Sequence, residues 1–188
     1  MTNLRVRRSS DVEHTLTMAI DQAPANVTAS FDALYRSSAD AVYAYAASLL
    51  RDRSAAEEVT AAAFERAFRK QRSFDPRRGT QRAWLFGIAR NAALDELRRR
   101  KRSAELTAEP AGDEPASEGE PEAAERRATV RAALAGLDPR ERELIALKFH
   151  AGLNNAEIAD VLGVSASNAG TRVHRALTRL REACNAPS

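Results

Sequence analysis

The sequence predicts an all-α protein made of two small helical domains joined by a flexible acidic linker. Alanine, the strongest helix former, is abundant. In two long stretches the apolar residues recur at steps of three and four, which is the period of an amphipathic helix. A segment rich in proline, glycine and glutamate separates these stretches, and none shows the alternation of a β-strand. A chain of 188 residues suits two domains of roughly 60–80 residues each.

The charged residues are unevenly distributed along the chain. The formal net charge is only +3, yet residues 97–102 read Leu-Arg-Arg-Arg-Lys-Arg. The following residues 103–125 hold eight acidic residues and no lysine or arginine. Concentrated positive charge favours a polyanionic partner, so we expect nucleic acid to bind the basic block.

The sequence indicates no metal site, no disulfide and no membrane span. The single cysteine, Cys184, gives neither an internal disulfide nor a multi-cysteine zinc site. His14 and His150 have no partners at metal-ligand spacing, so we expect no metal and no cofactor. No apolar run approaches the ~20 residues of a membrane span, and the best N-terminal run, residues 16–20, is too short for a signal peptide. The expected location is the cytoplasm, without membrane insertion.

The first predicted domain spans residues 30–102. One of its helices is expected to start at Ser54, because a serine N-cap followed three residues later by Glu57 makes a capping box. Residues 74–79 contain proline and glycine and are expected to form a loop. Thr80 can then cap a helix that runs into the basic block.

The remaining segments follow from composition and helix-start signals. Residues 1–29 have no strong period and are predicted to be a loose extension. Residues 103–122 are the predicted linker, since like charges repel one another and three prolines interrupt any helix. The second domain spans residues 123–184, and in it Asp138, followed directly by a proline, predicts a helix start. Gly152 is expected to end that helix.

Residues 156–181 have the pattern of a helix-turn-helix. Asn154 can cap the first short helix, Gly163 supplies the sharp turn, and Ser165 can cap a longer second helix with a polar outer face. Polar side chains on such a helix can reach base edges in the major groove, and arginines bind phosphates or guanine. The predicted contacts are made by Ser165, Ser167, Asn168, Thr171, Arg172 and Arg175. Two packed helices with a merely solvated polar face would show the same pattern.

Three further features of the sequence, a tryptophan, the basic run and a glycine, each have two interpretations. Trp84 precedes a helix whose end is the basic run, and aromatic rings can stack on unpaired bases while arginines follow the backbone. For Trp84 a place in the core is the favoured interpretation. For the basic run phosphate binding is favoured, because so dense a charge repels itself without a counterion. Gly170 costs its helix about 1 kcal/mol relative to alanine, and it either allows a close approach to DNA or is simply tolerated.

Together these features resemble the extracytoplasmic-function (ECF) subgroup of bacterial RNA polymerase sigma factors. Residues 84–102 are similar to the segment that melts and reads the −10 promoter element, and residues 137–181 to the domain that binds the −35 element. The resemblance covers roughly residues 30–183. It implies an alternative sigma factor that binds core RNA polymerase, directs promoter-specific initiation and has no catalytic site. Such sigma factors are commonly held by an anti-sigma protein.

The resemblance also implies roles for individual residues. The helix around Val59 would dock on the clamp helices of the largest polymerase subunit, with the flap as a further polymerase contact, although Ala61 and Ala62 stand where the family usually has Gln and Glu. The core-binding candidates are Glu57, Glu58, Val59, Phe64 and Arg66. The loop at residues 74–79 would capture a flipped-out base of the non-template strand. The −10 candidates are Asp75, Arg77, Arg78, Trp84, Arg90, Asn91, Arg98, Arg99, Arg100, Lys101 and Arg102.

Two other classes of protein remain as alternatives. A conventional helix-turn-helix regulator would use residues 30–102 for sensing or dimerisation, and it would need a ligand pocket or an apolar dimer face. An enzyme with a terminal DNA-binding module would need a catalytic serine or tyrosine or an acidic metal cluster. Asp95 and Glu96 are adjacent and therefore about 100° apart on a helix, so they do not converge on one metal.

Overall fold

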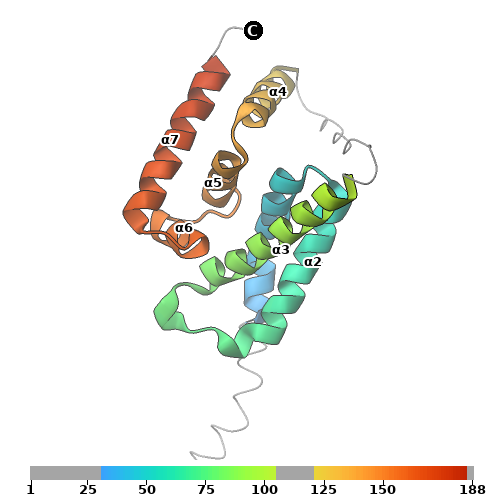
Figure 1. The fold of residues 1–188 in the computed structure, drawn as a ribbon, viewed down its shortest axis with the longest axis vertical. Coiled ribbons are helices and arrows are strands. Elements are labelled where there is room, and N and C mark those ends of the chain that lie inside the picture. The colour runs from blue at the N-terminus through green and yellow to red at the C-terminus, as the bar shows by residue number, and fades with distance from the viewer. Residues whose placement is uncertain (1–30, 105–120, 186–188) are drawn as a thin grey trace, which may run out of the picture. The chain divides into compact units, whose positions relative to one another are not determined.

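The computed structural model describes residues 31–104 and 121–185, and this part of the chain contains helices, turns and loops but no strand. It contains seven α-helices, which confirms the all-α prediction (Figure 1). The first helix covers residues 31–50. It is followed by α2 (Arg53–Lys70), the short 3₁₀ helices η1 (Gln71–Ser73) and η2 (Pro76–Arg78), α3 (Gln81–Ala104), α4 (Pro121–Gly136), α5 (Pro139–Phe149), α6 (Asn155–Leu162) and α7 (Ala166–Asn185).

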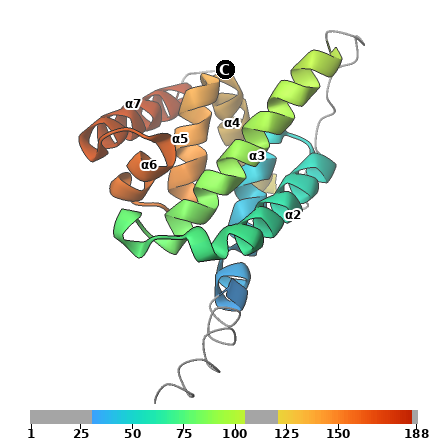
Figure 2. The same cartoon turned by 60° about the horizontal axis from the view of Figure 1, so that its bottom comes forward.

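The chain divides into two compact units after Arg36. The described part of the first unit is the beginning of the first helix, where Asp32 and Arg36 form an exposed ion pair at 2.6 Å. In the second unit, residues 37–188, α3 packs along α2, and α7 packs against α4, α5 and α6 (Figure 1). The long helix α3 also contacts α6, as Figure 2 shows from a second direction.

Small side chains allow the helices of the second unit to approach closely. Ala46, Ala56 and Ala93 are fully buried in one apolar cluster that joins the first helix, α2 and α3. Beside this cluster the rings of Tyr45 and Phe86 meet edge to face, with centroids 5.7 Å apart. Aromatic pairs prefer this geometry. The cluster holds α3 in place and thereby positions the surface that carries most of the −10 candidates.

Helix caps fix the elements near the predicted helix-turn-helix. Asp138 caps α5 in a capping box with Glu141, and Asn154 caps α6 in a capping box of its own. Gly163 ends α6 in the left-handed region, at φ 67°, where glycine carries no Cβ penalty. The Ser165 hydroxyl accepts the backbone N–H of Asn168 at 3.2 Å and caps α7. These helix-start and turn predictions are confirmed.

The predicted start of α2 was wrong by two residues. Asp52, not Ser54, is the N-cap, and its carboxylate accepts the backbone N–H of Ala55 at 3.0 Å. The preceding Arg51 adopts a left-handed conformation, at φ 51°, which ends the first helix. The chain therefore restarts at Asp52, whose negative charge also suits the positive end of the helix dipole.

Two predicted segments lie largely outside the described residues. These are the extension over residues 1–29 and positions 105–120 of the linker predicted at residues 103–122. Helix α3 continues to Ala104 and α4 begins at Pro121, so helix extends into both ends of the predicted linker. The domain limits drawn from the sequence stay predictions.

Candidate nucleic-acid interface

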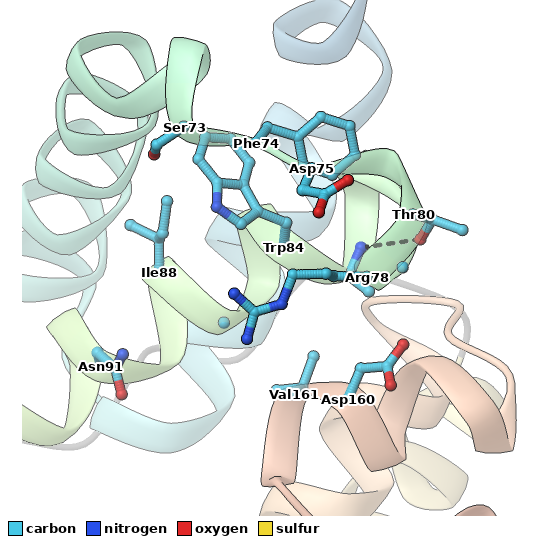
Figure 3. Close-up of a pocket in the computed structure, with 13 residues that line it drawn as sticks. Ser73, Phe74, Asp75, Arg78, Thr80, Trp84, Ile88, Asn91, Asp160 and Val161 are labelled. Atoms are coloured by element: carbon cyan, nitrogen blue, oxygen red, sulfur yellow. Dashed lines mark hydrogen bonds between the residues drawn. The ribbon is translucent and has the colours of Figure 1, made fainter.

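A pocket of about 370 Å³ lies where the loop after α2 meets the start of α3 (Figure 3). The rings of Phe74 and Trp84 form part of its wall, with centroids 5.6 Å apart and planes tilted by 51°. Asp75, Arg78 and Asn91 add polar groups to the lining. Trp84 is only half-buried, so the interpretation that it belongs to the core does not hold. The pocket combines aromatic faces with hydrogen-bonding groups.

Local hydrogen bonds give the pocket loop its shape. The Asp75 carboxylate accepts the backbone N–H of Arg77 at 3.0 Å and caps η2. The Thr80 hydroxyl accepts the backbone N–H of Ala83 at 3.1 Å, which confirms its predicted role as the cap of α3. Between them Gly79 has φ 137°, a conformation that L-residues rarely adopt. These hydrogen bonds therefore fix the conformation of the loop, which places Phe74 over α3.

Helix α6 closes the opposite side of the pocket. Asp160 and Val161 are part of its lining, as Figure 3 shows. The Thr80 hydroxyl donates to the Glu157 carboxylate at 2.7 Å. A Cβ added to Gly79 would meet the Asp160 carboxylate at 2.9 Å. The exposed Asp160 side chain could move away, so it is the backbone conformation that requires glycine here.

Arg90 is engaged by α5 in this structure. Its guanidinium donates to the two oxygens of Glu143 at 2.6 and 3.3 Å. The Tyr45 hydroxyl donates to the same carboxylate at 3.4 Å. Glu143 is only 8% exposed, and burial, followed by the charge of Glu143, raises the pKa of Tyr45 well above 10. Arg90 can reach DNA only if this contact opens.

The basic run at the end of α3 is not uniformly exposed. Arg98 and Arg99 are exposed but pair with Asp95 and Glu96 at 3.0 and 2.7 Å. Arg100 is half-buried and its side chain points back into the protein. The remaining members, Lys101 and Arg102, are exposed. The five residues therefore differ in what they can offer to a phosphate.

The predicted −35 surface is exposed along one side of α7. Ala169, Val173 and Ala176 are buried on the opposite side. All six candidates lie in exposed positions: Ser165, Ser167, Asn168, Thr171, Arg172 and Arg175. Exposure allows these side chains to enter a groove, as a recognition helix requires, although the Ser165 hydroxyl also caps α7.

Gly170 lies close to the side chain of Asn155, a contact that the sequence did not reveal. A Cβ at this position would meet the side-chain amide nitrogen of Asn155 at 3.1 Å. The exposed Asn155 side chain would have to move by a few tenths of an ångström to admit a Cβ. The two earlier interpretations, approach to DNA or mere tolerance, stay predictions.

The polymerase-docking candidates on α2 fall into two groups. Glu57, Glu58 and Arg66 are exposed, whereas Val59 and Phe64 are each 6% exposed and lie in the core. Buried side chains cannot contact a partner, so Val59 and Phe64 can act only by holding the exposed face of α2 in place.

No group of three or more metal-binding side chains occurs among the described residues. None of the helices in the described ranges is long and apolar enough to cross a membrane.

Family models match both halves of the chain. The model for Sigma-70 region 2 matches residues 34–103, which include the pocket loop, Trp84 and the basic run. The model for Sigma-70 region 4 matches residues 127–180, which include the helix-turn-helix.

Individual proteins agree with these matches. The ECF RNA polymerase sigma factor SigE of Mycolicibacterium smegmatis is 35% identical over 158 residues, which are 81% of this chain and 61% of that protein. SigL of Mycobacterium tuberculosis, also an ECF RNA polymerase sigma factor, is 31% identical over 164 residues, covering 86% of this chain and 93% of SigL.

Two solved structures are also similar. The sigma factor RpoE of Bartonella quintana, in complex with the anti-sigma factor NepR, superposes with a TM-score of 0.68 at 27% identity, covering 85% of this chain and 99% of RpoE. CnrH in complex with the cytosolic domain of CnrY gives a TM-score of 0.62 at 29% identity, covering 86% and 91% of the two chains.

Proposed function

Because this chain belongs to the ECF RNA polymerase sigma factors, which are alternative sigma factors that direct transcription initiation, we propose that it opens promoters by trapping an unpaired base. The base would enter the pocket beside Phe74 and Trp84. The observation that carries this proposal is the juxtaposition of the two ring centroids at 5.6 Å, one on a capped loop and the other on α3. Every base has a π-face that can stack on an aromatic ring.

Base capture offsets the cost of melting. Extruding a base from a duplex costs a few kcal/mol, and stacking on an aromatic side chain returns ~1–3 kcal/mol per base. Asp75, Arg78 and Asn91 supply hydrogen-bonding groups around the rings, and these would select the base. Arg77 is exposed beside the pocket and would bind the adjoining backbone.

The exposed side of α7 would read the −35 element. Its small polar residues would contact base edges in the major groove, and Arg172 and Arg175 would bind guanine or phosphate. Core polymerase would dock on the exposed face of α2 through Glu57, Glu58 and Arg66, with the clamp helices of the largest subunit as the partner and the flap as a second contact. These assignments rest on exposure and on the family.

Membership of the same family also suggests how the chain is regulated and where it acts. The similarity to a sigma factor solved with its anti-sigma protein supports control of this chain by an anti-sigma partner. It would act in the cytoplasm, where core polymerase is, and would contribute binding and strand separation while polymerase performs the chemistry. Membership of the sigma family disfavours the alternative of a conventional helix-turn-helix regulator.

Run-off transcription tests the proposal. Purified core polymerase would be incubated with a library of promoter fragments, with and without this chain. We expect specific transcripts that depend on the chain, and their start sites would return the −35 and −10 sequences together. Binding to duplex DNA without binding to core polymerase would overturn the proposal in favour of a conventional regulator.

A further inference from the structure

We infer that Arg100 is a positioning residue that ties the −10 helix α3 to the start of the polymerase-docking helix α2. In consequence only Lys101 and Arg102 of the basic run offer uncompensated charge to DNA. The inference rests on the proposed function for the roles of the two helices. It departs from the expectation that all five basic residues bind phosphate.

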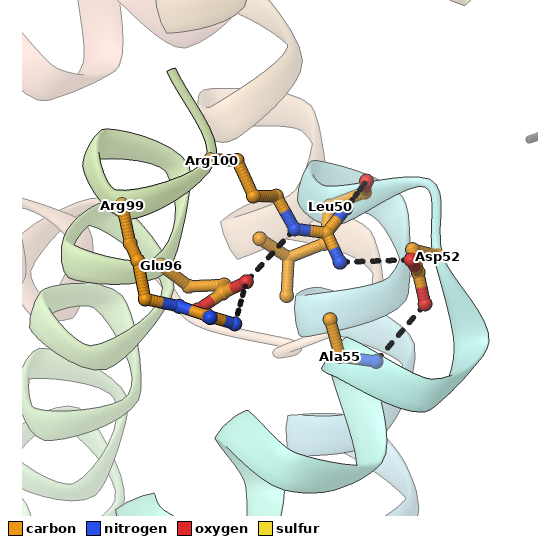
Figure 4. A network of polar contacts seen from close by, with 6 residues as sticks. All are labelled: Leu50, Asp52, Ala55, Glu96, Arg99 and Arg100. Atoms are coloured by element: carbon orange, nitrogen blue, oxygen red, sulfur yellow. Dashed lines mark hydrogen bonds and ion pairs between the residues drawn. The ribbon is translucent and has the colours of Figure 1, made fainter. Parts of the chain in front are cut away.

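Arg100 makes contacts with two parts of the protein at once (Figure 4). On its own helix, Nε donates to Glu96 at 2.8 Å. Across the helix interface, Nη2 donates to the Asp52 carboxylate at 2.8 Å. The side chain of Arg100 is 27% exposed and that of Glu96 is 10% exposed. A guanidinium is suited to such a role because its donors form a rigid planar fork.

Arg100 also contacts the turn between the first helix and α2. Arg100 Nη1 also donates to the carbonyl oxygen of Leu50 at 3.4 Å. That carbonyl lies at the end of the first helix, where the last C=O groups lack partners within the helix. The next residue, Arg51, has a positive φ without being glycine, a conformation that is unfavourable for residues with a side chain. Arg100 therefore holds the turn from which α2 begins.

Asp52 links the turn to α2 itself. One of its carboxylate oxygens accepts the N–H of Ala55, while the other accepts Arg100 (Figure 4). The N-cap of α2 and the C-terminal part of α3 thus share one carboxylate. Moving Arg100 to a phosphate would leave Asp52 and the Leu50 carbonyl without this partner.

The charges of the run divide accordingly. Arg98 pairs with Asp95 and Arg99 with Glu96. Arg100 pairs with both Asp52 and Glu96. Lys101 and Arg102 are exposed and have no ion pair or hydrogen bond within the described ranges. Two of the five cations in the run therefore have no acidic partner. Since each neutralised phosphate of duplex DNA contributes about 0.9 to the slope of log K against log salt, the run would contribute about 1.8 rather than about 4.5.

A double-mutant cycle tests the positioning role on the full chain alone. Arg100→Met keeps the aliphatic stem, and Asp52→Asn keeps a good N-cap while removing its charge. We expect the effects on the unfolding equilibrium to be non-additive by about threefold or more, as for contacting residues. Arg102→Met with Asp52→Asn is the matched control and should be additive. An additive result for Arg100 and Asp52 would overturn the positioning role.

The salt dependence of promoter binding tests the charge assignment. With holoenzyme on a promoter found by run-off transcription, Arg102→Met should lower the slope by about 0.9, or about 0.7 if the contact is to a single strand. Arg100→Met should leave the slope unchanged, and Arg100→Lys should do the same. A fall of similar size for Arg100→Met would overturn the inference. If the wild-type chain directs no promoter binding, the proposed function fails, while the unfolding cycle still decides the role of Arg100.

Discussion

The rings of Phe74 and Trp84 lie with their centroids 5.6 Å apart, although the two residues are ten positions apart in the chain. Two caps bring this about, because Asp75 starts η2 and Thr80 starts α3. The chain turns back between these residues and places Phe74 over the first turn of α3. An aromatic pair at the rim of a pocket suits stacking on an unpaired base, and the proposed promoter opening requires this pair.

Gly79→Ala should disrupt the pocket loop. The φ of 137° opposes a side chain, whereas the exposed Asp160 carboxylate 2.9 Å away could move. We expect the free energy of unfolding to fall by ~1–3 kcal/mol, measured by chemical denaturation. Gly136→Ala is the matched control, since nothing lies within 4 Å of a Cβ there, and it should be neutral or slightly stabilising. Equal effects of the two substitutions would contradict the proposed constraint.

Arg172→Ala should weaken the binding of holoenzyme to promoters that carry a −35 element. A specific base contact is worth ~1–3 kcal/mol, so holoenzyme affinity should fall about 5- to 150-fold in a gel-shift titration. Arg181→Ala, an exposed arginine further along α7, serves as the control and should have little effect. A loss that persists on DNA without the −35 element would show that the arginine does not read it.

Glu143→Gln should destabilise the protein without weakening promoter binding. The substitution removes a nearly buried charge that pairs with Arg90 and accepts from Tyr45. A buried hydrogen bond to a charged group is worth ~1.5–3 kcal/mol, and thermal unfolding should show a loss of that order. Promoter affinity should be unchanged or higher, because Arg90 becomes available. A parallel fall in stability and affinity would argue that Glu143 supports the DNA-binding surface.

Stability should fall in acid through Asp52 and Glu96. The N–H of Ala55 and then Arg100 lower the pKa of Asp52, and Arg99 followed by Arg100 lower that of Glu96. A carboxyl with a lowered folded-state pKa stabilises the fold above its unfolded pKa of about 4, and this is lost as pH falls through the folded value. The midpoint of thermal unfolding between pH 6 and pH 2.5 should therefore fall less for Asp52→Asn than for wild type. Asp40→Asn, at an exposed position, should follow wild type.

Local signals in the sequence predicted the helix-turn-helix well. Asp138, Asn154 and Ser165 are caps and Gly163 is the turn, because capping and left-handed turns depend on residues near in sequence. The start of α2 was misplaced because Ser54 and Asp52 are both good caps, and only the conformation of Arg51 decides between them.

Contacts between distant residues could not be predicted in this way. Nothing local indicates that Glu143 meets Arg90 or that Arg100 meets Asp52, since each pair is separated by about fifty positions. The contribution of Phe74 to the pocket was missed for the same reason, although an aromatic residue at the edge of a loop was a usable signal. Periodicity reveals which face of a helix is buried, but not which partner covers it.

The measurement that most directly tests base capture compares Trp84→Ala and Trp84→Phe on duplex and premelted promoters. Run-off transcription from duplex DNA should fall about 5- to 150-fold for Trp84→Ala, the equivalent of ~1–3 kcal/mol of stacking, and much less for Trp84→Phe, which keeps an aromatic face. A template with an unpaired −10 element should restore most of the activity, because melting is then no longer required. Equal loss on both templates, or full activity of Trp84→Ala on duplex DNA, would contradict the account.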